Sequence, residues 1–342
     1  MNFNINATTV GANEPVFIIA EACDNHMGDL KVAKEMARLS KLAGASAVKF
    51  QHHLPEEEML EDIPMSDNFD EPLFQFLKKN ALTLSEHVEL KNFCDDIGIT
   101  YLCTPFSWAA AIQLHELDLP AYKIGSGEMT DIPYLKKMID LGRPLIISTG
   151  MSDISEITRT YNLLDQGGIP FALLNCTSEY PPVYEDINLL FINEMINLFP
   201  NATIGHSDHT PDLFTCFGAV VAGAKIIEKH VIIDKTTPGP DQSVSINFSE
   251  LTELVDGIRK IEKALGSSKK VHSHENQIRE WATRSVVSTK SIKKGSVIEP
   301  DMVWSKRPGT GIPSHLIDDV IGKKALVDIN QNILIDWSML KE

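Results

Sequence analysis

The feature that most constrains the fold of this chain is a regular alternation of short apolar runs and helical periods between residues 16 and 265. Runs rich in Val, Ile and small residues predict buried strands, and apolar residues repeated every three to four positions predict amphipathic helices. The predicted strands cover 16–21, 45–51, 99–104, 121–124, 144–150, 171–177, 202–204 and 224–227. Eight strands alternating with eight helical stretches over roughly 250 residues are the pattern of a (β/α)8, or TIM, barrel.

Polar residues gather at or just beyond the carboxyl ends of these predicted strands. They are Glu21, Lys49, Gln51, Thr104, Lys123, Ser126, Glu128, Ser148, Thr177, Ser178, Ser207, His209, Glu228 and His230. In a barrel the carboxyl ends of the strands meet at one mouth, where catalytic residues lie. A doubly wound open sheet is the alternative fold, but it would bring together only the residues near its switch point.

The segments before and after the predicted barrel strands have different sequence patterns. Residues 1–13 predict an N-terminal arm or hairpin, so the barrel domain is expected to span 1–266. A polar linker or short helix is predicted over 267–284, and short strands and turns predict a compact C-terminal domain over 285–342. With fewer than 60 residues and few aromatic side chains, this domain is expected to have a thin core and to pack on a larger surface.

Charge and composition narrow the classes of partner. The formal net charge of −16 argues against binding to nucleic acids or anionic membranes, which require a basic surface. No segment resembles a secretory leader or a membrane span, and the five cysteines include no CxxC pair. We therefore expect a cytoplasmic protein with reduced thiols, in which any anionic substrate is held by a few placed cations and backbone donors.

Two histidines predict a metal site. His209 and His230 follow the seventh and eighth predicted strands, and neighbouring strands lie about 4.8 Å apart, so both imidazoles can reach one point. Two protein ligands leave coordination positions open for substrate, which is typical of a Lewis-acid metal. The alternative is that each histidine caps its own strand. Glu21, Glu128 and Glu228 are carboxylates within reach for proton transfer, and position alone does not choose among them.

Two lysines at strand ends, Lys49 and Lys123, predict a site for an anion such as phosphate, together with nearby hydroxyls and glycine-flanked backbone. The alternative is that Lys49 forms an ion pair with a neighbouring carboxylate, such as Glu21 or Glu128. The residues alone favour neither.

Collinear motifs along nearly the whole chain resemble those of the bacterial N-acetylneuraminate (sialic acid) synthase family. They are Ile19-Ala20-Glu21 with Asn25-His26 and Gly28, Val48-Lys49-Phe50-Gln51, Thr104-Pro105-Phe106-Ser107, Tyr122-Lys123-Ile124-Gly125-Ser126-Gly127-Glu128, Ser148-Thr149-Gly150-Met151, Cys176-Thr177-Ser178-Glu179-Tyr180-Pro181, Ser207-Asp208-His209-Thr210, Glu228-Lys229-His230 and Gly239-Pro240-Asp241. Arg307-Pro308-Gly309 resembles the antifreeze-like (SAF) domain, of the β-clip type, that ends those enzymes.

The resemblance implies a phosphoenolpyruvate-dependent nonulosonate synthase. Such an enzyme condenses phosphoenolpyruvate with N-acetylmannosamine and water to give N-acetylneuraminate and phosphate. Mn²⁺ is the metal expected first, with Mg²⁺ or Co²⁺ as alternatives. A domain-swapped homodimer is also implied, in which the small domain covers the partner's barrel. The alternative within the family is a legionaminic acid synthase, which uses 2,4-diacetamido-2,4,6-trideoxymannose, and a pseudaminic acid synthase is less favoured by Gly239-Pro240-Asp241.

The resemblance also implies roles for individual residues. Glu21 and Glu128 would be catalytic, and His209 and His230 would bind the metal. Phosphoenolpyruvate would be held by Lys49, Thr104, Lys123, Ser126, Ser148, Ser178 and Ser207. The sugar would be held by Gln51, Tyr180, Asp241, Trp281 and, from the partner subunit, Arg307.

Some residues depart from the family pattern. Ala22-Cys23-Asp24 stands where many members carry Ile-Gly and an apolar residue, which adds an acid near the mouth. Ser178 replaces an Asn found in some members, and Trp281 stands where an aromatic residue contacts the sugar. Two other classes of function are alternatives: a non-catalytic binding protein that works through its small domain, and a barrel aldolase or hydrolase that uses a metal without phosphoenolpyruvate.

Overall fold

The computed structural model describes residues 2–64 and 71–341. The chain divides into two compact units, 1–265 and 266–342. No helix within the described residues is both long enough and apolar enough to cross a membrane.

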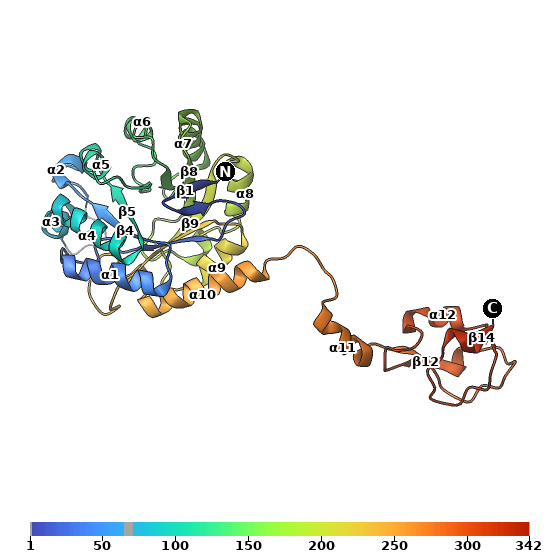
Figure 1. The fold of residues 1–342 in the computed structure, drawn as a ribbon. Coiled ribbons are helices and arrows are strands. Elements are labelled where there is room, and N and C mark those ends of the chain that lie inside the picture. The colour runs from blue at the N-terminus through green and yellow to red at the C-terminus, as the bar shows by residue number, and fades with distance from the viewer. Residues whose placement is uncertain (1, 65–70, 342) are drawn as a thin grey trace. The chain divides into compact units, whose positions relative to one another are not determined.

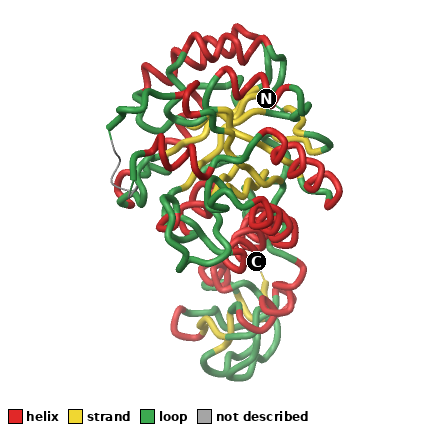
Figure 2. Tube along the Cα trace, turned by 90° about the vertical axis from the view of Figure 1, so that its left-hand side faces the viewer, coloured by secondary structure: helices red, strands yellow, loops and turns green. Residues whose placement is uncertain are grey.

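Eight parallel strands form the centre of the first unit (Figures 1 and 2). They are β3 (Phe17–Glu21), β4 (Ala47–His52), β5 (Thr100–Pro105), β6 (Tyr122–Ile124), β7 (Leu145–Ser148), β8 (Phe171–Cys176), β9 (Thr203–Asp208) and β10 (Ile226–His230). Hydrogen-bonded pairing runs in the order β5-β4-β3-β10-β9-β8-β7-β6, and β5 also lies against β6. The predicted barrel is therefore confirmed, with β5 and β6 as its one loosely joined seam.

Helices surround the strands of the first unit (Figure 2). They are α1 (Leu30–Ala43), α2 (Pro55–Glu58), α3 (Leu73–Asn80), α4 (Leu84–Ile97), α5 (Trp108–His115), α6 (Ile132–Asp140), α7 (Ile154–Gly167), α8 (Phe191–Leu198), α9 (Phe214–Val221) and α10 (Phe248–Ala264). Local signals fix several ends: α1 stops at Gly44 in the left-handed conformation, and Asp153 and Asn247 form capping boxes at the starts of α7 and α10.

A hairpin of β1 (Phe3–Ile5) and β2 (Thr8–Val10) lies at the end of the barrel where the strands begin. Its residues Phe3, Ile5 and Val10 share one buried cluster with early strand residues such as Phe17. Because this packing fills the amino-terminal end, the barrel is open to ligands at the carboxyl ends of its strands.

The last two barrel strands are longer than the apolar pattern predicts. The prediction ended them at Ile204 and Ile227, but β9 continues through Asp208 and β10 through His230. Glu228 pairs in register with Ser207 on one side and with Ile19 on the other. Polar side chains are tolerated inside these strands because both neighbours satisfy the backbone while alternate side chains point into the barrel mouth.

The second unit consists of short elements around its own aliphatic core. It contains α11 (Ser273–Ala282), β11 (Ser285–Ser288), β12 (Val303–Lys306), α12 (Ile317–Val320), β13 (Lys324–Ala325) and β14 (Leu340–Lys341). β11 pairs antiparallel with β12, and β13 with β14. The core is built from Val286, Ile292, Ile298, Val303, Ile312, Val320, Ala325, Ile329, Ile335 and Leu340, without an aromatic residue. The region predicted as a linker contains α11.

Candidate active site

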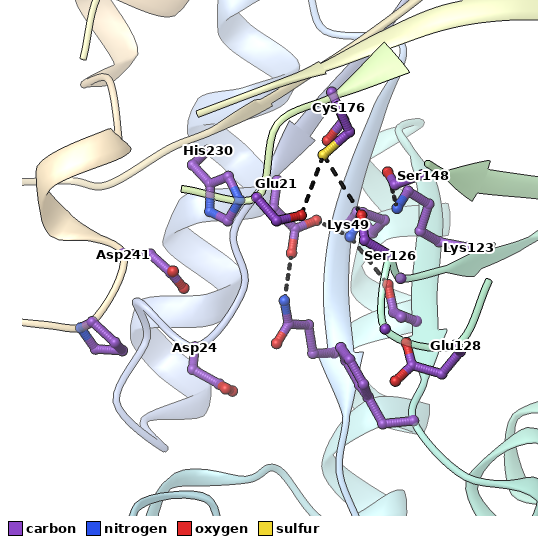
Figure 3. Close-up of a pocket in the computed structure, with 18 of the residues that line it drawn as sticks. Glu21, Asp24, Lys49, Lys123, Ser126, Glu128, Ser148, Cys176, His230 and Asp241 are labelled. Carbon is purple, nitrogen blue, oxygen red and sulfur yellow. Dashed lines mark hydrogen bonds and ion pairs between the residues drawn. The ribbon is translucent and has the colours of Figure 1, made fainter. Parts of the chain in front are cut away.

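A cavity of about 490 Å³ opens at the carboxyl ends of the barrel strands (Figure 3). Its lining includes the predicted residues Glu21, Lys49, Gln51, Thr104, Lys123, Ser126, Glu128, Ser148, Ser178, Tyr180, Ser207, His209, His230 and Asp241. Residues that are up to 220 positions apart in the sequence thus meet because all eight strands end at this mouth.

The remaining two predicted residues, Trp281 and Arg307, belong to the second unit. There the guanidinium of Arg307 lies 5.4 Å from the centre of the Trp281 ring, within cation–π range. Arg307 Nε also donates a hydrogen bond to the backbone oxygen of Ala282 (3.1 Å). The two residues are therefore neighbours.

Two buried lysines create the cationic part of the pocket. Lys49 on β4 donates to Thr104 Oγ1 (3.1 Å), and Lys123 on β6 donates to Ser148 Oγ (2.8 Å). Both side chains are nearly inaccessible to water. Buried ammonium groups interact strongly with an anion because little water screens them, so this region suits a phosphate or carboxylate.

Carboxylates surround the lysines. Lys49 forms an ion pair with Glu21, and Glu228 Oε1 lies 3.9 Å from Lys49 Nζ and 3.6 Å from Lys123 Nζ. Burial raises the pKa of Glu21 to about 7, with Glu228 adding to the effect and Lys49 opposing it. Burial also opposes ionisation of Glu228, but Lys123 and Lys49 outweigh it and lower the pKa of Glu228. The two acids are thus set for different protonation states near neutral pH.

Two glycines make room for pocket side chains. A Cβ added at Gly150 would lie 2.2 Å from Ser178 Oγ and 2.8 Å from Ser126 Oγ. The Gly150 N–H donates to Ser126 Oγ (3.1 Å). At Gly125 an added Cβ would lie 2.5 Å from a carboxylate oxygen of Glu128. A side chain at either position would push these hydroxyls or this carboxylate aside.

Glu128 is a second buried acid in the pocket. Its Oε2 has no hydrogen-bond partner among the described residues. Burial raises the pKa of Glu128 to about 7, although its own backbone N–H and Lys123 lower it in part. A carboxyl group with this pKa and a free oxygen is suited to exchanging a proton with a bound substrate.

The two histidines predicted as metal ligands face each other with their ring centres 5.1 Å apart. His209 Nδ1 donates to the Thr177 backbone oxygen (2.8 Å), which leaves Nε2 as an acceptor. His230 Nδ1 is buried without a hydrogen-bond partner among the described residues. One atom of His230 also lies within 4.8 Å of ligand atoms of Cys23 and Asp241. This donor set fits a divalent transition metal.

Several pocket residues were not predicted as site residues. His53 Nδ1 lies 3.0 Å from Glu58 Oε1, and its Nε2 lies 3.0 Å from Gln51 Oε1 and 3.5 Å from Asp24 Oδ2. Gln51 in turn donates to Glu21 Oε1 (3.1 Å). The acid at Asp24 was visible in the sequence as a departure from the family, but nothing there indicated that Glu58 from α2 joins it.

His206, on the same strand as Ser207, has a structural environment instead. Its Nδ1 donates to the Asn175 backbone oxygen (2.9 Å), and its Nε2 lies 3.0 Å from Asp208 Oδ2. Asp208 also forms a buried ion pair with Lys229. Both ring nitrogens of His206 are therefore engaged within the protein, unlike those of His209 and His230.

Comparison with known proteins agrees with this architecture. The chain matches the NeuB family over residues 36–270 and the SAF domain over 283–341. It is 35% identical to human N-acetylneuraminate-9-phosphate synthase, covering 94% of this chain and 92% of that protein. It is 36% identical to N,N'-diacetyllegionaminic acid synthase of Campylobacter jejuni, covering 93% of this chain and 98% of that protein.

A solved structure of a sialic acid synthetase is also similar to this chain. The N-acetylneuraminic acid synthetase of Leptospira borgpetersenii, crystallised with citrate, matches with a TM-score of 0.75 and 32% identity, covering 81% of this chain and 95% of that one. The resemblance inferred from the sequence motifs is thereby confirmed. The chain belongs to the NeuB family of sialic acid-type synthases and carries a C-terminal SAF domain.

Proposed function

We propose that this protein condenses phosphoenolpyruvate with N-acetylmannosamine and water to give N-acetylneuraminate and phosphate. The observation that carries the proposal is the pair of buried lysines, Lys49 and Lys123, in one cavity with two histidines. Each histidine has a ring nitrogen without a hydrogen-bond partner among the described residues. The lysines provide a site for a small anion, and the histidines provide a site beside it for a metal that can activate an aldehyde. It disfavours the alternative of a binding protein that works only through its small domain.

Phosphoenolpyruvate would bind at the cationic part of the pocket. Lys49 and Lys123 would neutralise its charges, and hydroxyls would replace the water that its oxygens lose. The hydroxyls that we assign to it are those of Thr104, Ser126, Ser148, Ser178 and Ser207. An aldolase or hydrolase that does not use phosphoenolpyruvate would have no need for two buried lysines here.

In the reaction, C3 of phosphoenolpyruvate attacks the sugar aldehyde, water adds at C2, and phosphate leaves. We assign proton transfer to Glu21, which contacts both Lys49 and Gln51, and to Glu128, whose Oε2 has no hydrogen-bond partner in the described part of the chain. His209 and His230 would hold a divalent metal, with Mn²⁺ expected first. When bound, such a metal supplies Lewis-acid polarisation of the aldehyde oxygen.

The charge of the pocket favours a sugar without a phosphate group. Among the described residues that line the cavity, Lys49 and Lys123 are the only lysines or arginines, and phosphoenolpyruvate would occupy both. In Figure 3, Asp24 and Asp241 lie on the other side of Glu21 from Lys123. Residues 54–64, which include Glu58 of the cavity lining, add further acids to this region and no Lys or Arg. A second phosphate would therefore meet carboxylates.

Hydroxyl groups suit these carboxylates better. Asp24 Oδ1 has no hydrogen-bond partner among the described residues, so a sugar hydroxyl can satisfy it. This favours N-acetylmannosamine. The second candidate is 2,4-diacetamido-2,4,6-trideoxymannose, the substrate of a legionaminic acid synthase, because Met59, Leu73 and Leu77 give the same cavity an apolar wall.

The test is to compare three sugars with purified protein, Mn²⁺ and phosphoenolpyruvate. We expect kcat/KM for N-acetylmannosamine to exceed that for its 6-phosphate by at least about tenfold, the effect of roughly 1.4 kcal/mol of charge repulsion. Consumption of phosphoenolpyruvate and the mass of the product are measured for each sugar. Preference for the trideoxy sugar would replace the substrate by the second candidate, and no consumption with any sugar would refute the proposal.

We also propose a domain-swapped homodimer in which the partner's Arg307 and Trp281 complete the sugar site. Lys49→Met and Arg307→Ala are each expected to be inactive, but mixing them should restore activity. Random exchange of equal amounts makes half of the dimers mixed, each with one intact site, so about a quarter of the wild-type activity should return. Mixing Lys49→Met with Glu21→Gln, both in the first unit, is the control that should restore none. Failure of the first mixture would argue against the swap.

A further inference from the structure

A thiol lies beside the histidine and carboxylate at the metal end of the pocket. The ligand atoms of Cys23, His230 and Asp241 all lie within 4.8 Å of one another. Cys23 is fully buried, two residues beyond the end of β3. Thiolate, imidazole and carboxylate are three common types of ligand for borderline divalent metals.

A second observation points to a ligand at the same place. His230 is only 5% exposed, yet its Nδ1 has no hydrogen-bond partner among the described residues. Buried polar atoms in native proteins are nearly always satisfied, by protein, by water or by an ion. His230 therefore combines an unsatisfied buried nitrogen with a ring that reaches a thiol and a carboxylate, as expected of a metal ligand.

The backbone around the three residues is tied together. Asn25 Nδ2 donates both to the Val231 backbone oxygen (2.9 Å) and to Ser245 Oγ (3.0 Å). Ser245 Oγ donates to the Asp241 backbone oxygen (2.6 Å). The loops that carry Cys23 and Asp241 are thus fixed to the segment that follows β10. A site held in this way requires little rearrangement to bind an ion.

We propose that Cys23 is a thiolate ligand of the metal, joining His230 and Asp241 beside His209. The inference rests on the metal site of the proposed function and extends it with a sulfur ligand. On binding, the thiol releases its proton to the buffer and the sulfur lone pair forms the bond. A sulfur ligand shifts preference from Mn²⁺ and Mg²⁺ toward Co²⁺ and Zn²⁺.

Cobalt spectroscopy tests the proposal independently of catalysis. Metal-free protein is titrated anaerobically with Co²⁺, and a near-ultraviolet thiolate-to-cobalt absorption is expected, with one Co²⁺ per chain. Cys23→Ser and Cys23→Gly should both abolish this band. The glycine variant guards against misfolding, because Cys23 has a left-handed backbone (φ 40°) that glycine adopts freely. Calorimetry should show Co²⁺ binding weakened about 10–100-fold, and Mn²⁺ binding weakened less.

Two other cysteines sharpen the test, Cys94 as a control and Cys176 as a competing ligand. Cys94 is buried on α4 and does not line the pocket, so Cys94→Ser should keep the band. Cys176 Sγ lies 3.9 Å from His209 Nδ1 and is the competing thiol. Loss of the band in Cys176→Ser with retention in both Cys23 variants would overturn the proposal. So would wild-type protein that shows no band or binds no Co²⁺. If wild-type protein without the band still consumed phosphoenolpyruvate, only the sulfur ligand would be refuted and the proposed function would stand.

Discussion

Replacing Lys49 with methionine is expected to lower kcat/KM for phosphoenolpyruvate by about 10³-fold, since the loss of one preorganised donor already costs about 10²–10³-fold and Lys49 carries a full charge. Lys49 is 2% exposed and lies between Glu21 and Glu228. Methionine keeps the length and apolar volume of the side chain but removes the charge. Phosphate release at varied phosphoenolpyruvate concentration measures the loss.

The same substitution should also destabilise the protein, by about 3 kcal/mol, because removal of one partner leaves buried carboxylates unpaired. Stability is measured by urea unfolding of the metal-free protein. The double variant Lys49→Met with Glu21→Gln should recover much of this stability, since it removes one of the two carboxylates. It should recover no activity. This separation distinguishes a lysine that binds substrate from one that only balances a buried acid.

Lys79→Met is the matched control. Lys79 lies on the surface of α3, with its side chain 67% exposed in a pair with Glu71. Exposed ion pairs contribute about 0–1 kcal/mol, so stability and activity should remain close to wild type. If Lys49→Met behaved like Lys79→Met, the assignment of the cationic region to phosphoenolpyruvate would be wrong.

The sequence was sufficient to predict the barrel and the residues at its mouth. The alternation of apolar runs and helical periods identifies the strands without any knowledge of which strands pair. In a closed parallel barrel, the carboxyl ends of all the strands meet at one mouth. Residues as distant as Glu21 and His230 could therefore be assigned to one pocket before any contact was known. Their individual roles remain proposals.

Pairing inside the mouth could not be predicted in the same way. The sequence left open whether Lys49 faces a substrate phosphate or a carboxylate, and named Glu21 and Glu128 as possible partners. The structure pairs Lys49 with Glu21 and brings Glu228 to 3.9 Å. Strand register decides this, because Glu21 lies opposite both Lys49 and His230 on its two neighbours. Register depends on the whole barrel and has no local signal here.

The lengths of β9 and β10 and the contacts of His53 in the pocket could not be predicted, for related reasons. Polar residues such as Asp208 interrupt the apolar pattern, so the pattern ends before the strand does. Asp208 is nevertheless satisfied by His206 and Lys229, which are two and twenty-one residues away. His53 meets Glu58 through the single-turn helix α2, which is too short to show a helical period.

Replacing His230 with alanine should abolish synthase activity and the stabilisation that Mn²⁺ provides, while leaving the metal-free protein as stable as the wild type within about 1 kcal/mol. His230 Nδ1 makes no hydrogen bond to the described residues, so truncation breaks none there, and removal of this unsatisfied nitrogen offsets the packing lost with the buried ring. Mn²⁺ at a hundred times its Kd stabilises a folded protein by about 2.7 kcal/mol. Urea unfolding with and without Mn²⁺ therefore measures metal binding at this site directly. A chelator should reproduce the loss of activity in the wild type.

His206→Ala is the matched control, because His206 is equally buried and sits two strand positions before Asp208. It should lose two hydrogen bonds, one of them to a charged partner, and about 2–3 kcal/mol of stability, yet keep the stabilisation by Mn²⁺. The two substitutions are thus expected to give opposite results in urea unfolding: His230→Ala loses the stabilisation by Mn²⁺, and His206→Ala loses stability without metal. If His230→Ala instead destabilised the metal-free protein as much as His206→Ala and kept its response to Mn²⁺, His230 would be a strand cap, and the metal would have to be sought elsewhere in the pocket.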